Sequence, residues 1–158
     1  MRIGVISDTH GSREAIRRAV AATGPVDFWL HAGDFSQDAA FLAELTRVPT
    51  RAAAGNCDGA TTAKPDEFVE VEGVRIWLTH GHRYRAKERG DELAEWAVRY
   101  EVDVVVFGHS HVPEISRRGE VLLVNPGSAA LPRGGSGPSC GVIRIRDGVI
   151  DAELVSLI

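Results

Sequence analysis

Apolar residues in the first third of the chain fall in short runs separated by segments of helical periodicity. The runs at residues 2–7, 27–31 and 50–53 predict short buried strands, and residues 13–23 and 37–46 predict helices between them. Ser12 is placed to cap the first helix. This strand–helix alternation predicts a parallel sheet with right-handed crossovers. The expected inward residues are Ile16, Ala19, Val20 and Thr23 of the first helix, and Phe41, Leu42 and Leu45 of the second.

The pattern changes after residue 65. Two alternating runs, 68–71 and 74–78, flank Glu72-Gly73 and predict a hairpin. A helix is expected from about residue 87 to 100, followed by a Val-rich buried strand at 103–107. Two more hairpins are predicted at Arg118-Gly119 and Asp147-Gly148. The Gly- and Pro-rich stretch 129–139 predicts an irregular loop, which is either the rim of a site or a plain connection. We therefore expect an α/β protein whose second half is mostly antiparallel, with two sheets face to face and helices outside. The inward residues expected in the third helix are Leu93, Trp96, Ala97 and Tyr100.

Length and composition narrow the functional classes. The 158 residues predict one domain spanning 1–158. A net charge of −4 provides no general attraction for a polyanion, so a nucleic-acid partner is disfavoured. Two cysteines make no disulfide framework, which predicts a reducing, cytoplasmic location. No apolar stretch approaches the length of a membrane span, so a membrane partner is not expected.

Polar motifs follow the predicted strands in a regular order. They are Asp8-Thr9-His10, Gly33-Asp34, Gly55-Asn56-Cys57-Asp58, His80-Gly81-His82 and Gly108-His109-Ser110-His111. Five of the six histidines lie in these motifs, and the sixth, His31, lies two residues before the Gly33-Asp34 motif. Each motif alone is more often a turn or a buried polar group than a site. Because the carboxyl ends of parallel strands meet in one crevice, five such motifs in order predict a shared site.

The residue types in these motifs predict metal chemistry. Asp8 and Asp34 bring two negative charges, so two divalent cations would leave the cluster at a formal charge of +2. Such a site attracts phosphate oxygens, and a water held between the cations loses a proton near neutral pH. Imidazole, carboxylate and amide ligands without thiolate suit manganese, iron, nickel, cobalt or zinc. The motifs therefore indicate a hydrolytic metalloenzyme.

In order and spacing, the five motifs resemble those of the calcineurin-like metallophosphoesterases. The resemblance covers essentially the whole chain. Asn56-Cys57-Asp58, the segment 125–128 (Asn-Pro-Gly-Ser) and Pro132-Arg133 are similar to the small YfcE-like phosphodiesterase branch. The resemblance implies a four-layer αββα sandwich of two mixed sheets flanked by helices. It also implies two divalent metal ions, with manganese the first choice and Asp34 as the bridging carboxylate. One metal would be held by Asp8, His10, Asp34 and His111, and the other by Asp34, Asn56, His80 and His109.

Two positions depart from the wider family. Many of its phosphatases have Asn-His-Asp or Asn-His-Glu, whose His helps to protonate the leaving group, whereas Cys57 stands there in this chain. A thiol is a poor acid catalyst at neutral pH, so packing is favoured over catalysis for Cys57. Ala54 stands where similar proteins often have a basic residue, which removes one expected phosphate contact.

Three further residues are candidates near the site. His82 shares a strand face with His80 if that strand continues, so it is expected to touch substrate or to support a metal ligand. Arg133 in the Gly-rich loop is the candidate for gripping a phosphate. His31, inside a predicted strand, is expected in the core or behind a ligand.

The sequence thus favours a phosphodiesterase that hydrolyses a small phosphoester with a hydroxide bridging two divalent metals. Two alternatives stay open: a phosphomonoesterase, and a non-catalytic protein-interaction scaffold like the retromer subunit of similar fold. A nuclease is chemically compatible but is weakened by the acidic charge. The natural substrate, the native metal and homo-oligomerisation are left open.

Overall fold

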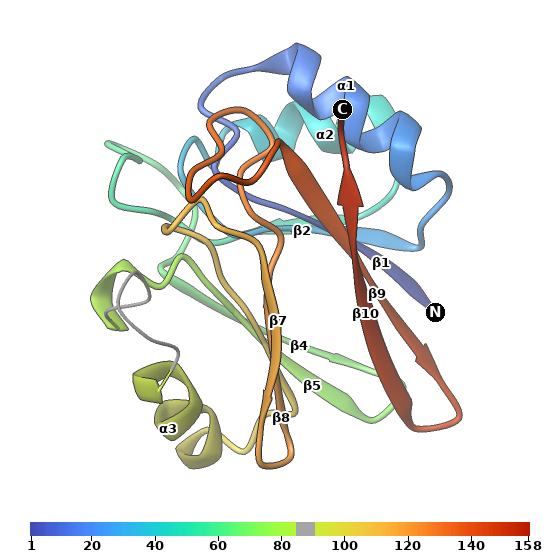
Figure 1. The fold of residues 1–158 in the computed structure, drawn as a ribbon, viewed down its shortest axis with the longest axis vertical. Coiled ribbons are helices and arrows are strands. Elements are labelled where there is room, and N and C mark those ends of the chain that lie inside the picture. The colour runs from blue at the N-terminus through green and yellow to red at the C-terminus, as the bar shows by residue number, and fades with distance from the viewer. Residues whose placement is uncertain (85–90) are drawn as a thin grey trace.

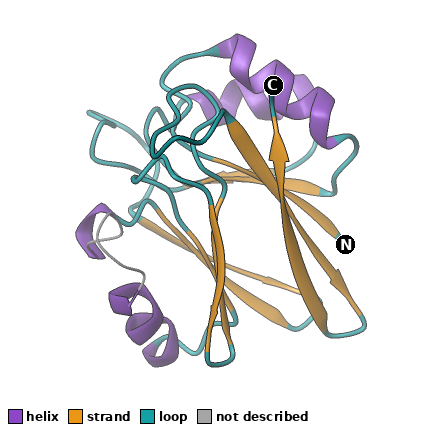
Figure 2. Ribbon diagram, in the orientation of Figure 1, coloured by secondary structure: helices purple, strands orange, loops and turns teal. Residues whose placement is uncertain are grey.

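Two five-stranded sheets face each other and carry helices on their outer faces (Figures 1 and 2). The computed structural model describes residues 1–84 and 91–158. The first sheet has the order β10 (Val149–Ser156), β9 (Ser139–Arg146), β1 (Arg2–Ile6), β2 (Phe28–His31), β3 (Thr50–Ala52). The second has the order β4 (Asp66–Val71), β5 (Val74–Thr79), β6 (Val104–Val106), β8 (Val121–Asn125), β7 (Glu114–Arg118).

The helices complete a four-layer αββα sandwich. Helices α1 (Arg13–Thr23) and α2 (Asp38–Thr46) cover the first sheet, and α3 (Asp91–Arg99) covers the second. A short 3-10 helix, η1 (His82–Tyr84), follows β5. The expected fold class is therefore confirmed. None of the described helices has the length and apolar character needed to cross a membrane.

Three apolar layers hold this sandwich together. Alternate strand residues fill the space between the sheets, among them Ile3, Leu30, Ile76, Val104, Val124 and Ile143. The opposite faces of the strands pack under the helices: Trp29 lies under α1 and α2, and Trp77 lies near α3. Burial of apolar side chains on both faces of β1, β5 and β6 explains why these strands are continuous apolar runs.

The first half of the chain forms as expected. Strands β1, β2 and β3 are parallel neighbours. Ser12 caps α1 by accepting a hydrogen bond from the Ala15 backbone N–H at 3.2 Å. Ile16 and Ala19 are fully buried, and Val20 is half-buried. In α2 only Leu42 is fully buried, and the expectation for Leu45 was wrong because its side chain is 41% exposed.

The second half differs from expectation in topology. In the second sheet β5, β6 and β8 are parallel neighbours, and β4 and β7 at its edges pair antiparallel. The reason is that α3 and the β7 segment return the chain to the same end of the sheet before β6 and β8 begin. The final hairpin leaves this sheet and joins the first, where β9 pairs with β1.

Local boundaries also shifted. The turn predicted at Arg118-Gly119 lies at Gly119-Glu120, while those at Glu72-Gly73 and Asp147-Gly148 form as predicted. Of the helix predicted at 87–100, residues 87–90 lie outside the described residues. Leu93 and Ala97 are fully buried, whereas Tyr100 follows α3 and is 39% exposed.

Candidate metal centre

The five polar motifs meet at one end of the sandwich. Asp8 follows β1, Asp34 follows β2 and Asn56 follows β3, while His80 follows β5 and His109 follows β6. Backbone hydrogen bonds join these loops, from Asp8 N–H to the Gly33 carbonyl at 2.9 Å and from Gly108 N–H to the His80 carbonyl at 3.0 Å. The carboxyl ends of parallel strands from both sheets therefore form one site.

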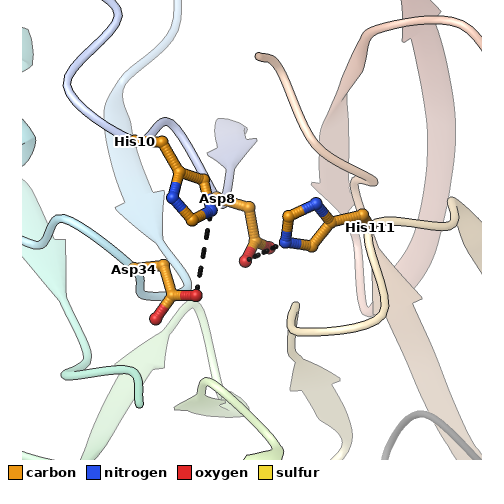
Figure 3. A group of neighbouring side chains, drawn as sticks. All are labelled: Asp8, His10, Asp34 and His111. Carbon is orange, nitrogen blue, oxygen red and sulfur yellow. Dashed lines mark ion pairs between the residues drawn. The ribbon is translucent and has the colours of Figure 1, made fainter. Parts of the chain in front are cut away.

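Four side chains converge in the centre of this site (Figure 3). One ligand atom from each of Asp8, His10, Asp34 and His111 lies within 4.8 Å of the others. The His111 Nε2 is 3.2 Å from Asp8 Oδ1, and the His10 Nε2 is 3.8 Å from Asp34 Oδ2. This spacing suits four ligands around one cation.

A second set of side chains lies on the other side of Asp34. The His80 Nε2 is 3.4 Å from Asp34 Oδ2 and 3.8 Å from Asp8 Oδ1. The His109 ring lies 5.1 Å from the His80 ring, and its backbone N–H donates to Asp8 Oδ2. Asn56 is exposed on the next loop, which is tied to the site because Cys57 N–H donates to Asp34 Oδ1 at 2.8 Å. Asp34 therefore lies near a histidine of each set, His10 and His80.

Backbone carbonyls orient two of the buried imidazoles in the site. His80 Nδ1 donates to the Ala32 carbonyl at 2.7 Å, and His111 Nδ1 donates to the Leu131 carbonyl at 2.6 Å. In each ring this leaves Nε2 facing the carboxylates with its lone pair available. A hydrogen bond at the other ring nitrogen is the usual support of a metal-binding histidine.

Unsatisfied buried atoms show that the site fits a cation. Asp8 Oδ1, His10 Nε2 and His80 Nε2 are buried and make no hydrogen bond to any described residue. Leaving such atoms unpaired is costly, and two buried carboxylates require positive charge nearby. A divalent ion among these atoms would satisfy all three. The donor set therefore fits the metal that the sequence predicts.

The pKa shifts of the clustered residues also indicate a site for a cation. Burial opposes ionisation of Asp34, but the adjacent His80 imidazole and the Cys57 N–H outweigh it and hold its pKa below the usual range. Burial disfavours protonation of His80, yet the Asp34 carboxylate 3.4 Å from its Nε2 and the charge of Asp8 raise its pKa. The pKa of His111 is raised mainly by the Asp8 carboxylate 3.2 Å from its Nε2. The site thus attracts positive charge.

The backbone that carries these residues is strained. Five of the predicted metal ligands have positive φ angles of 46° to 72°, a region that residues with a side chain rarely adopt. Several tight turns at strand ends aim these side chains inward. The residues are Asp8, His10, Asp34, His109 and His111.

The motif glycines allow the loops to approach closely. A Cβ on Gly55 would lie 2.2 Å from Asp34 Oδ1, and one on Gly33 would lie 2.6 Å from His80 Nδ1. On Gly108 it would lie 2.1 Å from Ser7 Oγ. The glycines that precede Asp34, Asn56 and His109 are therefore a packing requirement of the site.

Buried polar side chains behind the ligands were missed by sequence reasoning. Ser7 Oγ donates to Asp8 Oδ2 at 2.6 Å. Ser128 Oγ donates to the Asp8 carbonyl at 2.8 Å and accepts the Leu131 N–H at 2.7 Å. The half-buried Asp58 accepts hydrogen bonds from the backbone N–H groups of Ser36 and Gly55. In the sequence, their supporting role was indicated only by their positions: Ser7 and Asp58 lie beside predicted ligands or in their motifs, and Ser128 lies in segment 125–128.

A further buried chain of hydrogen bonds connects two ligand loops. Gly33 N–H donates to His31 Nδ1 at 3.1 Å, so the proton of the neutral ring is on Nε2, which donates to Thr9 Oγ1 at 2.8 Å. The Thr9 hydroxyl then donates to Asp38 Oδ2 at 2.6 Å, which also accepts Gly11 N–H. Burial lowers the pKa of His31 against the opposing charge of Asp38, which favours the neutral ring. His31 is therefore a buried residue behind the ligand loops, where the sequence analysis expected it.

The structure places the remaining candidates around the rim. The strand does not continue to His82, because β5 ends at Thr79 and His82 begins η1. Its ring nevertheless lies 5.5 Å from that of His80 and 6.1 Å from that of His109. Arg133 is exposed in the Gly-rich loop, and its backbone N–H donates to the His111 carbonyl at 3.1 Å. Cys57 is exposed beside Asn56, so the expectation that it packs as a small buried residue was wrong.

Known proteins are similar in sequence to this chain. The model of the calcineurin-like phosphoesterase superfamily domain matches residues 1–148. A probable metallophosphoesterase of Methanothermobacter thermautotrophicus is 36% identical over 163 residues, which cover 98% of this chain and 92% of that protein. The phosphodiesterase YfcE of Escherichia coli is 35% identical over 97 residues, which cover 56% of this chain and 49% of YfcE.

Solved structures share its fold. A predicted phosphoesterase from Streptococcus pneumoniae superposes with a TM-score of 0.84 at 28% identity, covering 99% of this chain and 89% of that one. Vps29 of Entamoeba histolytica, solved as a zinc complex, gives 0.79 at 22% identity over the full length of both chains. The second likeness shows the fold alone. Because the family model spans almost the entire sequence, and a relative matches at 36% over nearly all of it, the chain belongs to the calcineurin-like phosphoesterase superfamily.

Proposed function

We propose that this chain is a divalent-metal-dependent phosphodiesterase that hydrolyses small phosphoesters at the centre around Asp34. The observation that carries the proposal is the set of buried, unpaired atoms Asp8 Oδ1, His10 Nε2 and His80 Nε2 turned toward one space. A scaffold without metal has no use for such atoms, because each destabilises the fold unless a cation is bound.

The chain's own residues would divide the work as follows. Asp34 lies near His10 and His80 and would bridge two cations, with Asp8, His10 and His111 holding one of them. His80, His109 and Asn56 would complete the other side. When bound, divalent cations supply positive charge for the phosphoryl oxygens and acidify an attacking water. Manganese is the proposed metal, with iron, nickel, cobalt and zinc compatible with the same ligands.

Residues at the rim would handle the substrate. Arg133 is anchored through its backbone to His111, which leaves its guanidinium in solvent to bind a phosphoryl oxygen. Burial and the nearby charges of His80 and Arg83 lower the pKa of His82, so its ring is neutral near pH 7. A neutral ring beside the cluster would contact substrate by hydrogen bonding without adding charge.

Diesters are proposed over monoesters because of Cys57. Burial and the neighbouring Asp34 carboxylate raise the pKa of the Cys57 thiol, which makes it a poor proton donor at neutral pH. A poor alkoxide leaving group therefore receives no help at this position. The match to a relative named as a phosphodiesterase supports the same choice. The exposed Cys57 thiol is assigned no part in proton transfer, and a cytoplasmic location is proposed for the protein.

Two alternatives predict different results in one assay. The test compares kcat/KM for an aryl phosphodiester, the matching aryl monoester and an alkyl monoester, at one pH with Mn²⁺ present. The diesterase proposal predicts that the aryl diester is fastest. A fastest alkyl monoester would instead establish a phosphomonoesterase with another proton donor. Absence of turnover on all three, in protein shown to contain metal, would favour the scaffold alternative that the Vps29 fold represents.

A further inference from the structure

A surface hollow begins at the loop that carries Asn56. It has a volume of about 740 Å³ and is lined by α2, β3, the loop at 57–63 and Glu67 of β4. We call it the Cys57 hollow, because Cys57 and Asp58 form the end nearest Asp34. Ser36, two residues after Asp34, lines the same end and is tied to the loop by the Asp58 and Thr61 side chains. The hollow therefore shares two loops with the candidate metal centre.

Its size exceeds what a small ester group needs. Ligand sites in proteins typically measure about 300–1,000 Å³. A methyl ester would leave the hollow filled with water, whereas an organic group of several carbon atoms would occupy it. A phosphoester bound between Asp34 and Asn56 would extend such a group across Cys57 into this space.

The lining selects the chemistry of that group. It contains no aromatic and no large aliphatic side chain; the residues facing it are mainly alanines, glycine and hydroxyl or amide side chains. Gln37 and Thr62 are exposed, and the Gln37 side chain makes no capping hydrogen bond to α2, so both side chains are accessible to a ligand. Base stacking and alkyl-chain binding both require large apolar surfaces that this lining lacks.

Charge excludes a second anionic group. The Asp58 carboxylate accepts hydrogen bonds from the backbone N–H groups of Ser36 and Gly55. Arg51 forms an ion pair with Glu67 at 3.4 Å. Two carboxylates against one guanidinium leave the lining with a formal charge of −1. An additional phosphate or carboxylate on the substrate would therefore be repelled.

From this geometry we infer that the Cys57 hollow binds the non-leaving ester group of the substrate, and that this group is a neutral, non-aromatic polyol or sugar. The inference rests on the proposed phosphodiesterase function and adds a substrate class to it. Hydroxyl groups would exchange hydrogen bonds with Gln37 and Thr62, and the small side chains would leave room for them.

The test uses three diesters with one leaving group. All release 4-nitrophenolate and differ only in the second ester, which is methyl, glyceryl or phenyl. We expect kcat/KM for the glyceryl diester to exceed both others by about tenfold, the effect of one or two good hydrogen bonds.

Two variants localise the effect to the hollow. Ala40→Trp fills it from an exposed position of α2 and is expected to reduce the glyceryl-to-methyl ratio to near one. Gln37→Ala removes a donor that makes no capping bond in α2 and is expected to lower the same ratio severalfold. Ala21→Trp, at an exposed position of α1 outside the hollow, is the matched control and should preserve the ratio.

The outcomes separate the two claims. Hydrolysis of all three diesters without glyceryl preference, or a preference that survives both hollow variants, would overturn the inference and leave the phosphodiesterase standing. Failure to hydrolyse any of the three would refute the proposed function, and the inference with it.

Discussion

Replacing Thr9 by Val tests whether the buried chain from His31 to Asp38 positions the metal ligands. Thr9 lies between Asp8 and His10 and is fully buried. Its hydroxyl accepts from His31 Nε2 at 2.8 Å and donates to Asp38 Oδ2 at 2.6 Å. Valine keeps the shape of the side chain and removes both hydrogen bonds.

The size of the effect follows from what is left behind. An unsatisfied buried donor costs about 1–3 kcal/mol, and a hydrogen bond to a charged group contributes about 1.5–3 kcal/mol. Asp38 keeps its hydrogen bond from the Gly11 N–H, so both contributions are taken near the lower end of their ranges. Together they predict a loss of about 3 kcal/mol in the free energy of unfolding. For a chain of this length the loss lowers Tm by roughly 6–12 °C.

Thr9→Val should also lower the affinity for metal, and this effect can be measured apart from the loss of stability. The chain of hydrogen bonds joins the loop carrying Asp8 and His10 to Gly33, the neighbour of Asp34. Loss of such support behind metal ligands typically lowers affinity about 10- to 100-fold. The assay is Mn²⁺ titration by calorimetry on metal-stripped protein, at a temperature where each variant is folded, together with thermal unfolding.

Thr9→Ser is the matched control, because it keeps the hydroxyl and removes one methyl group, at a cost of about 1 kcal/mol. It should retain metal affinity close to that of the parent. Equal stability and equal affinity of the Val and Ser variants would refute the reasoning. A destabilised Val variant with unchanged affinity would show that these hydrogen bonds support the fold and do not position the ligands.

Three further predictions follow from the geometry. Asp34→Asn should reduce both Mn²⁺ occupancy and turnover by at least about 100-fold, whereas His82→Ala at the rim should change occupancy little; equal occupancy in Asp34→Asn and the parent, by elemental analysis, would exclude a bridging role. Gly55→Ala should lower metal affinity because its Cβ would meet Asp34 Oδ1 at 2.2 Å, while Gly59→Ala, with nothing within 4 Å, should behave like the parent in the same titration. Burial raises the pKa of the Cys140 thiol to about 11 from an ordinary 9.0, so the unfolded chain ionises first. Stability from this group is present below pH 9 and is lost as pH rises toward 11, by up to about 3 kcal/mol; denaturant unfolding of Cys140→Ala should lack that part of the slope, and an identical slope would contradict the burial argument.

Short-range patterns predicted most elements of the fold. The Ser12 cap, the periodicity of Ile16 and Ala19, and the Glu72-Gly73 turn are local signals, and the structure has each of them. The pairing of β5, β6 and β8 was not predictable in this way. Strand partners depend on how distant segments pack, and hairpin signals beside β7 made the second sheet look antiparallel.

In the site, too, local sequence signals identified some residues, while others depend on long-range contacts. The residues now gathered around Asp34 were selected because their types and order are unusual, and five motifs at strand ends are informative together. The residues behind them gave no comparable signal: Thr9, Ser128 and Asp38 are ordinary polar residues in sequence. Their importance comes from hydrogen bonds spanning up to 120 residues, as from Ser128 to Asp8. The exposure of Leu45 likewise depends on tertiary packing that its helix alone does not reveal.

Metal titration of the stripped protein tests the central claim most directly. Protein freed of metal by chelation is titrated with Mn²⁺ while bound metal per chain and hydrolysis of an aryl phosphodiester are measured on the same samples. The account predicts no turnover in the stripped protein and a rise that reaches its plateau when two ions are bound per chain. Full turnover in the stripped protein, or two bound ions with no turnover, would contradict it.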